Sequence, residues 1–314
     1  VIEDWEIYMS HDKHVIDGIN KDANLWPGCS LKDAKDYYLG LAEGWIPYNP
    51  PPVVMTHNGV RVVRDDMIVG TKTRAGDLLA SKINNDTIVY SQPRVGLAGV
   101  SILDVAKHHD RKVVLFMPSS KRISLHQACC IERGATPIFQ RIASMRNLNA
   151  SAAQWAEDNG AFFVPLGLRH ELATAGIVHA ASQIPEPQEV YVAISTGVLS
   201  RALQIAWPNA KFVCVAVARN LKAGELGRAD VISEKLPFTS DEKEENLPPF
   251  PVVKSYDAKV WKFIPKDGII DRLFWNVGQE PVLLDDTIYD RIDSERKWKK
   301  HEVSSSSSVH SDRV

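Results

Sequence analysis

One segment of the chain carries the strongest signal: Val63-Arg64-Asp65-Asp66-Met67-Ile68-Val69-Gly70-Thr71-Lys72-Thr73-Arg74-Ala75-Gly76-Asp77-Leu78-Leu79. It predicts a strand, a short polar turn and the start of a helix, with Lys72 at the junction. The positive end of the helix macrodipole disfavours a cation at that position. A lysine whose ammonium form is disfavoured can act as an amine nucleophile and form a Schiff base with a carbonyl cofactor. A solvated surface lysine is the alternative interpretation.

The composition is that of a soluble globular protein. With 314 residues, 44% hydrophobic and 24% charged, the chain can form one elaborate domain or two closely associated ones. The formal net charge of −2 argues against an electrostatic nucleic-acid or membrane binder, although local patches remain open. The sequence has no apolar run of about 18 residues, so we expect no membrane span.

The cysteines and histidines predict neither a disulfide framework nor a metal site. The acidic start, Val1 to Trp5, lacks the basic flank and apolar stretch of a signal peptide. We therefore expect a cytoplasmic protein with reduced core thiols and no metal. The residues considered are Cys29, Cys129, Cys130, Cys214, His108, His109, His126, His170 and His179.

The middle of the chain alternates strands and helices. Strands are expected at 87–90, 112–117, 136–139, 161–164, 189–194 and 211–217, and helices at 72–83, 96–109, 121–133, 146–159, 170–182 and from about 195. Short buried strands separated by helices of about 12 residues are typical of a parallel sheet covered on both faces.

The flanking segments are less regular. A hairpin is expected at 53–55 and 60–63 around His57-Asn58-Gly59, after a lead-in of short helices. Residues 219–256 are charged and proline-rich and predict a solvated, lid-like loop. A strand at 260–264, a helix at 266–276 and a disordered tail at 301–314 complete the expected elements.

The turn Ser195-Thr196-Gly197-Val198-Leu199-Ser200 follows the strand at 189–194 and opens a helix. Hydroxyls, a glycine and a helix N-terminus together can bind a phosphate. The alternative is an ordinary N-cap made by Ser195 or Thr196.

The order of these features resembles the fold type II family of pyridoxal-phosphate enzymes, which contains cysteine synthase, the tryptophan synthase beta subunit, threonine synthase and aminocyclopropane-carboxylate deaminase. The resemblance covers roughly residues 60 to 290. The motifs that carry it are Arg64-Asp65-Asp66, Gly70 to Arg74, Ser91 to Ala106, Val113 to Pro118, Arg133-Gly134-Ala135, Tyr191 to Leu203, Trp207-Pro208 and Leu283-Leu284-Asp285 with Tyr289.

Two departures from the family pattern bear on the cofactor. Ser91-Gln92-Pro93-Arg94 stands where family members have Ser-x-Gly-Asn, whose asparagine meets the ring hydroxyl. Gln92 or Arg94 makes that contact, or it is absent. The phosphate loop has one glycine, Gly197, so the phosphate would rest on Thr196, Ser200 and backbone N–H groups.

The resemblance implies two doubly wound, mostly parallel sheets with the cofactor cleft between them. The larger, cofactor-binding domain would comprise 1–84 and 185–300, and the smaller, mobile one 85–184. Lys72 would be catalytic and hold pyridoxal 5'-phosphate as a Schiff base. The resemblance implies cofactor contacts at Lys72, Thr71, Arg74, Ser91, Gln92, Arg94, Ser195, Thr196, Gly197, Ser200 and Tyr289.

Beta-elimination or replacement on a small amino acid is the expected reaction, because it is the family's commonest outcome. Decarboxylation, or another modification of an amino acid attached to a larger body such as a nucleobase, is the alternative; the loop at 219–256 would then help to form a wide, basic-lined mouth. A non-catalytic binding protein on the same fold also remains open. A phosphoribosyltransferase-like reading lacks the acidic pair and phosphate loop of that family. The family usually forms homodimers, so we expect one.

Overall fold

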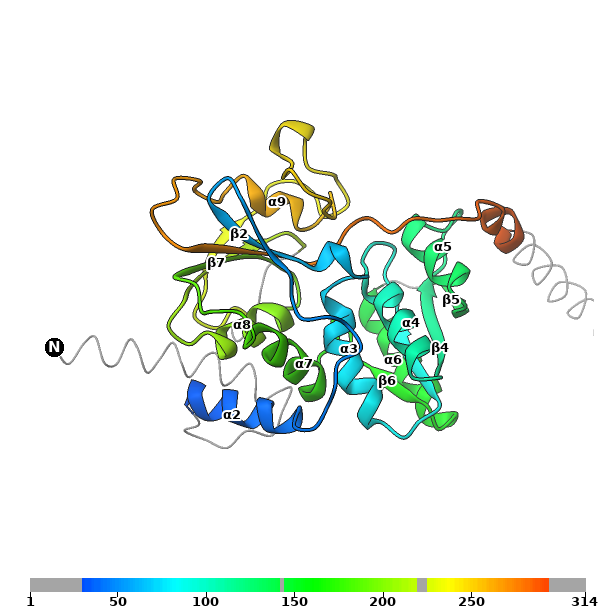
Figure 1. Ribbon diagram of the computed structural model, residues 1–314. Coiled ribbons are helices and arrows are strands. Elements are labelled where there is room, and N and C mark those ends of the chain that lie inside the picture. The colour runs from blue at the N-terminus through cyan, green and yellow to red at the C-terminus, as the bar shows by residue number, and fades with distance from the viewer. Residues whose placement is uncertain (1–29, 142–143, 219–224, 294–314) are drawn as a thin grey trace, which may run out of the picture.

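The computed structural model describes residues 30–141, 144–218 and 225–293. The predicted tail at 301–314 and Cys29 lie outside the described residues. Two sheets and the helices that cover them make up the described fold (Figure 1).

The larger sheet has six strands in the order β1 (Val54–His57), β2 (Val60–Arg64), β10 (Arg272–Asn276), β7 (Glu189–Ile194), β8 (Lys211–Ala216) and β9 (Asp230–Ser233). Only β1 is antiparallel to its neighbour, across the predicted hairpin turn. Central strands such as β7 alternate between two cores, with Val190 and Val192 on one face and Tyr191 on the other. The sheet is therefore buried on both faces, as expected for parallel strands.

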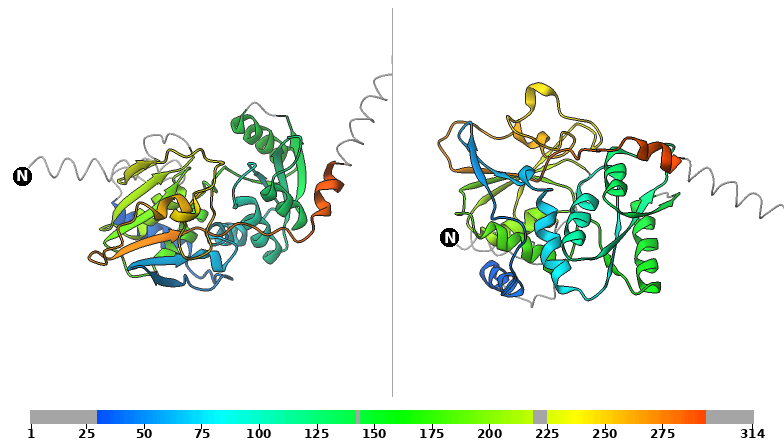
Figure 2. Two further views of the ribbon diagram at one scale, coloured as in Figure 1. Left: turned by 90° about the horizontal axis from the view of Figure 1, so that it is seen from above. Right: turned by 45° about the vertical axis from the view of Figure 1, so that its right-hand side comes forward.

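Different elements cover the two faces of this sheet. On one side lie α2 (Leu31–Leu41), α3 (Thr71–Lys82), α7 (Glu171–Ala181) and α8 (Val198–Ala206). On the other side, residues 250–264 with the short helix α9 (Ala258–Trp261) pack against the strands, and Phe250 and Trp261 form an apolar cluster with strand residues such as Phe274. Figure 2 shows the same separation from two further directions.

The smaller sheet is all parallel, in the order β5 (Thr136–Gln140), β4 (Lys112–Pro118), β3 (Thr87–Ser91) and β6 (Phe162–Val164). Helices α4 (Ala98–His108) and α5 (Leu125–Glu132) pack on one face, and α6 (Met145–Asp158) packs on the other. The predicted fold class, two mostly parallel sheets with helices, is confirmed.

The domain boundaries stay a prediction. The strands of the smaller sheet all fall within 85–184. Helix α7 also falls in that range, but it packs against α2, α3 and α8.

Two predicted elements were wrong: a predicted strand contains the end of a helix, and a predicted helix contains a strand. Residues 260–264 do not form a strand, because α9 ends at Trp261 and turns follow. Val260 and Ile264 are four residues apart and share one apolar cluster, which is helical spacing. The predicted helix at 266–276 is instead loop followed by β10, whose five residues are all buried. Such a continuous buried run suits a central parallel strand.

The predicted loop at 219–256 also contains regular structure, since β9 adds an edge strand and η2 (Glu244–Asn246) forms a single turn. Within the described ranges, no helix is long and apolar enough to cross a membrane.

Candidate active site

Lys72 is the second residue of α3, directly after β2 and the single turn η1 (Asp65–Met67). The backbone N–H of Thr71 donates to the carbonyl of Val277 at 2.9 Å. This bond ties the start of α3 to the chain leaving β10. The amine of Lys72 donates to the carbonyl of Gly167 at 3.2 Å.

Burial lowers the pKa of the Lys72 amine from 10.5 to about 8, although the side chain keeps some solvent access. Roughly half of the amine is then neutral at pH 8, whereas under about 1% of an ordinary surface lysine is. A neutral amine with some access is what a nucleophilic lysine requires.

Gly167 joins Lys72 to the predicted phosphate turn. It lies in the loop after β6, with a positive φ of 82°. A Cβ added there would lie 2.4 Å from the hydroxyl oxygen of Thr196. The residue that accepts from the Lys72 amine therefore also touches the turn after β7.

The predicted phosphate turn, Ser195 to Gly197, leads directly into a helix. Gly197 has a φ of 78° and directly precedes the nine-residue helix α8. A side chain at Gly197 would meet the carbonyl of Glu225 at 2.3 Å. The hydroxyl of Ser195 lies 3.2 Å from that of Tyr256. Ser200 is turned into the core instead, where its hydroxyl contacts the sulfur of Cys214 at 3.1 Å.

Thr71 and Arg74 belong to a buried network around Asp65. The hydroxyl of Thr71 donates to one carboxylate oxygen at 2.8 Å. The guanidinium of Arg74 donates to the other at 2.9 Å, and the indole N–H of Trp275 also donates to the carboxylate, at 3.1 Å. This network fixes the start of α3 and so positions Lys72.

Asp65→Asn is expected to lower the free energy of unfolding by about 2 kcal/mol, because hydrogen bonds to a charged group are worth about 1.5–3 kcal/mol. Urea denaturation measures the loss. Asp86→Asn, at a position more exposed than the fully buried Asp65, is the control and should leave the unfolding midpoint nearly unchanged. An equal loss in both variants would contradict the network's role.

The loop after β3 departs from the predicted cofactor contact. The Gln92 side chain is buried, accepts from the N–H of Gly99 at 2.8 Å and donates to the carbonyls of Pro93 and Gly96 at 3.0 Å. It folds the loop onto α4. The neighbouring Ser91 hydroxyl is buried without a hydrogen-bond partner in the described structure, and Arg94 is exposed.

Tyr289 lies in a helical turn near the end of the described chain. The Arg122 guanidinium lies 4.5 Å from the centre of its ring. Figure 1 shows this turn beyond α5, at the outer side of the smaller sheet. The structure therefore places Tyr289 with α5 rather than beside Lys72.

Sequence reasoning missed two residues of the site. Gly167 lies in Leu166-Gly167-Leu168, directly after a predicted strand. An isolated glycine at such a place is a turn signal that the sequence offered. Tyr256 comes from the loop at 219–256 and has no local signal. Its place beside Ser195 depends on long-range packing.

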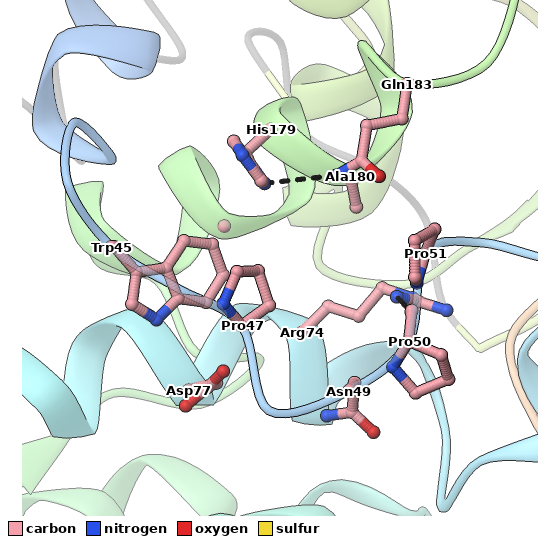
Figure 3. A pocket seen from close by; sticks show the side chains of 11 residues that line it. Trp45, Pro47, Asn49, Pro50, Pro51, Arg74, Asp77, His179, Ala180 and Gln183 are labelled. Carbon is pink, nitrogen blue, oxygen red and sulfur yellow. Dashed lines mark hydrogen bonds between the residues drawn. The ribbon is translucent and has the colours of Figure 1, made fainter.

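A cavity of about 280 Å³ lies on the opposite face of α3 (Figure 3). Arg74 and Asp77 line it, and at 100° per residue they stand on the side of the helix away from Lys72. His179 of α7 and Trp45 face them across the cavity. The cavity is separate from the arrangement of Lys72, Gly167 and Thr196.

The described part of the chain holds no cluster of three or more His, Cys, Asp or Glu side chains suited to a metal. Cys129, Cys130 and Cys214 are free and buried, as the sequence predicted.

Solved structures confirm the fold. An ACC deaminase homologue shares a TM-score of 0.63 at 16% identity, over 77% of this chain and 94% of the other. Maize serine racemase gives 0.61 at 14%, over 86% and 98%. Threonine deaminase isoform 2 from Solanum lycopersicum gives 0.62 at 11%, over 80% and 86%. No family model matches the chain, and a search of curated protein sequences finds no match.

The chain has the fold of the type II pyridoxal-phosphate enzymes. Pyridoxal phosphate is the cofactor expected from this fold. Three observations fit it: the Lys72 amine has a lowered pKa, the turn at Ser195 to Gly197 precedes a helix, and the buried Ser91 hydroxyl lacks a partner in the described structure. The side chain of Gln92, used within its own loop, does not add to that set.

Tyr256→Phe is expected to weaken pyridoxal-phosphate binding by about threefold to tenfold, because one neutral hydrogen bond is worth about 0.5–1.5 kcal/mol. Fluorescence titration measures the affinity. The hydroxyl of Tyr191, on the same face of the sheet, meets Glu189 instead, so Tyr191→Phe is the control. Unchanged affinity in Tyr256→Phe would mean that Ser195 does not depend on this contact.

Proposed function

We propose that this protein is a pyridoxal-phosphate-dependent enzyme that acts on an amino acid through Lys72, by beta-elimination or replacement. The observation that carries the proposal is the contact of the Lys72 amine with Gly167, which itself abuts Thr196. An amine with a lowered pKa and the turn proposed to bind the phosphate therefore both lie next to Gly167, on a fold used by such enzymes.

The chain's own residues have separate roles in this proposal. Lys72 attaches the cofactor and then moves the proton at the substrate's alpha carbon, since an amine with a pKa near 8 can both accept and donate it. Thr196 and the backbone N–H groups at the start of α8 hold the phosphate, and Ser195 with Tyr256 supports that turn. When bound, the cofactor supplies the electron sink for the carbanion.

The other residues predicted to contact the cofactor fall into two groups, according to where they lie. Ser91, at the end of β3, and Arg94, in the loop after it, are proposed to contact the cofactor. Thr71 and Arg74 act through Asp65 on the position of Lys72. A homodimer and a cytoplasmic location are also proposed, the latter because three buried free thiols suit a reducing compartment.

An absorbance spectrum tests the proposal. Purified protein mixed with pyridoxal phosphate should gain a band near the visible edge that borohydride bleaches. Peptide mapping after reduction should then find the pyridoxyl group on Lys72. A protein without the band, or with the label spread over surface lysines, would be a binding protein on this fold.

A further inference from the structure

Basic residues gather at one edge of the smaller sheet. The carboxyl ends of parallel strands meet at the same edge, and four loops leave it. The described residues of these connections, at 92–97, 119–124, 141, 144–146 (the last two in the first turn of α6) and 165–170, contain six Lys or Arg and no Asp or Glu, although the whole chain has 39 acidic and 37 basic residues. The six are Arg94, Lys121, Arg122, Arg141, Arg146 and Arg169.

The opposite edge of the same sheet is mixed in charge. Asp86 and Asp110 precede β3 and β4 there, together with Arg111. The positive charge is therefore a property of the carboxyl edge. The N-termini of α4, α5 and α6 also lie at this edge and add their positive dipole ends.

One end of this edge lies next to Lys72. The Gly167 carbonyl that accepts from the Lys72 amine belongs to the loop after β6, the first strand of the row. From β6 the row continues through β3 and β4 to β5. At about 4.8 Å per strand the basic edge extends roughly 14 Å from the site.

Several of these cations are exposed. Arg94, Lys121 and Arg146 are exposed and make no ion pair with another described residue. Arg169 lies 3.4 Å from Glu225, and Arg122 lies over Tyr289, so those two have partners. Acidic groups near the edge include Glu132, which accepts two N–H groups, and Glu280, which lies 3.6 Å from His126. Burial raises the pKa of Tyr289, the ring beside Arg122, and the carboxylate of Asp286 also lies close enough to raise the pKa of that tyrosine.

We propose that the substrate is an amino acid with a phosphate-bearing extension, and that the extension lies along this basic edge while the amino-acid end reacts at Lys72. The inference rests on the proposed function. A phosphate carries a charge of about −1.5 to −2 and three strong acceptor oxygens, which suits a row of separated Lys and Arg side chains. A single amino-acid carboxylate would use only the first of them.

Isothermal titration with tripolyphosphate tests the edge. The protein is first loaded with pyridoxal phosphate and reduced with borohydride, so that the probe does not compete for the turn at Ser195. The double variant Lys121→Ala/Arg146→Ala is expected to bind at least about fivefold more weakly than wild type, since exposed ion pairs are worth up to about 1 kcal/mol each. The binding should also weaken with added salt.

The matched control is Lys107→Ala/Lys112→Ala, which removes the same charge from exposed positions at the opposite edge. It should bind tripolyphosphate like wild type. Equal weakening in both double variants would show only a dependence on the total charge of the protein and would overturn the proposal. Failure of wild type to bind tripolyphosphate would overturn it too, as would binding of citrate with the same affinity. The spectrum of each sample is recorded after loading and before reduction: a cofactor band without later probe binding overturns this inference alone, and probe binding without the band overturns the proposed function.

Discussion

Lys72→Ala is expected to lower turnover by at least about a thousandfold, because in the proposed function this residue both attaches the cofactor and carries the proton at the alpha carbon. It should nevertheless fold at least as stably as wild type at pH 7. Burial lowers the pKa of this amine to about 8, so the folded protein disfavours the charged form that the unfolded chain carries. Removing the amine removes that cost.

The pH dependence checks the same point. Between about pH 8 and 10.5 the unfolded chain binds the Lys72 proton more tightly than the folded one, so wild-type stability should rise with pH across this window. The rise attributable to Lys72 should be absent in Lys72→Ala. Urea denaturation at pH 7 and 9.5 measures it, and Lys82→Ala, at an exposed position of the same helix, is the control. A borohydride-sensitive band in Lys72→Ala would contradict the assignment.

Local sequence predicted the alternating elements because their apolar residues are arranged by local rules. Strands such as 189–194 are short buried runs. The helix predicted at 121–133 begins at Leu125 instead, where Ser124 and Gln127 form a capping box. The errors near residues 260 and 272 have a common reason. Both segments contain a short run of apolar residues without a clear period, and only their packing partners distinguish a short helix from a central strand.

The candidate site was predictable where one motif carries one role. Lys72 and Thr196 lie in such motifs, and both lie close to Gly167 in the structure, while their roles toward a cofactor stay predictions. Gln92 shows the limit of this reasoning. A side chain one methylene longer than asparagine can turn back on its own loop, and here it binds Gly99. No periodicity in the sequence reveals that choice.

Residues contributed across the fold were beyond local sequence. Asp65 and Trp275 are 210 residues apart and share the hydrogen bonds that hold Thr71. Tyr256 reaches Ser195 across 61 residues. Their pairing depends on the strand order of the larger sheet, in which β10 lies between β2 and β7.

Gly167→Ala is expected to weaken pyridoxal-phosphate binding by roughly a hundredfold. The new Cβ would lie 2.4 Å from the Thr196 hydroxyl oxygen, in a backbone conformation with φ of 82°. Such overpacking costs about 1–3 kcal/mol and the strained backbone about 1 kcal/mol more, and each 1.4 kcal/mol is tenfold in affinity. Either the Thr196 side chain moves away from the proposed phosphate position, or the Gly167 carbonyl moves out of hydrogen-bond distance of the Lys72 amine.

Gly160→Ala separates strain from displacement. Gly160 also has a positive φ, 61°, but a Cβ there meets nothing within 4 Å. It should lose about 1 kcal/mol of stability and bind the cofactor like wild type. Equilibrium dialysis measures both affinities, and urea denaturation shows that each variant is folded. Suppose that Gly167→Ala binds pyridoxal phosphate as tightly as Gly160→Ala does. Then Lys72 and Thr196 do not both bind the cofactor next to Gly167, and the phosphate must bind elsewhere.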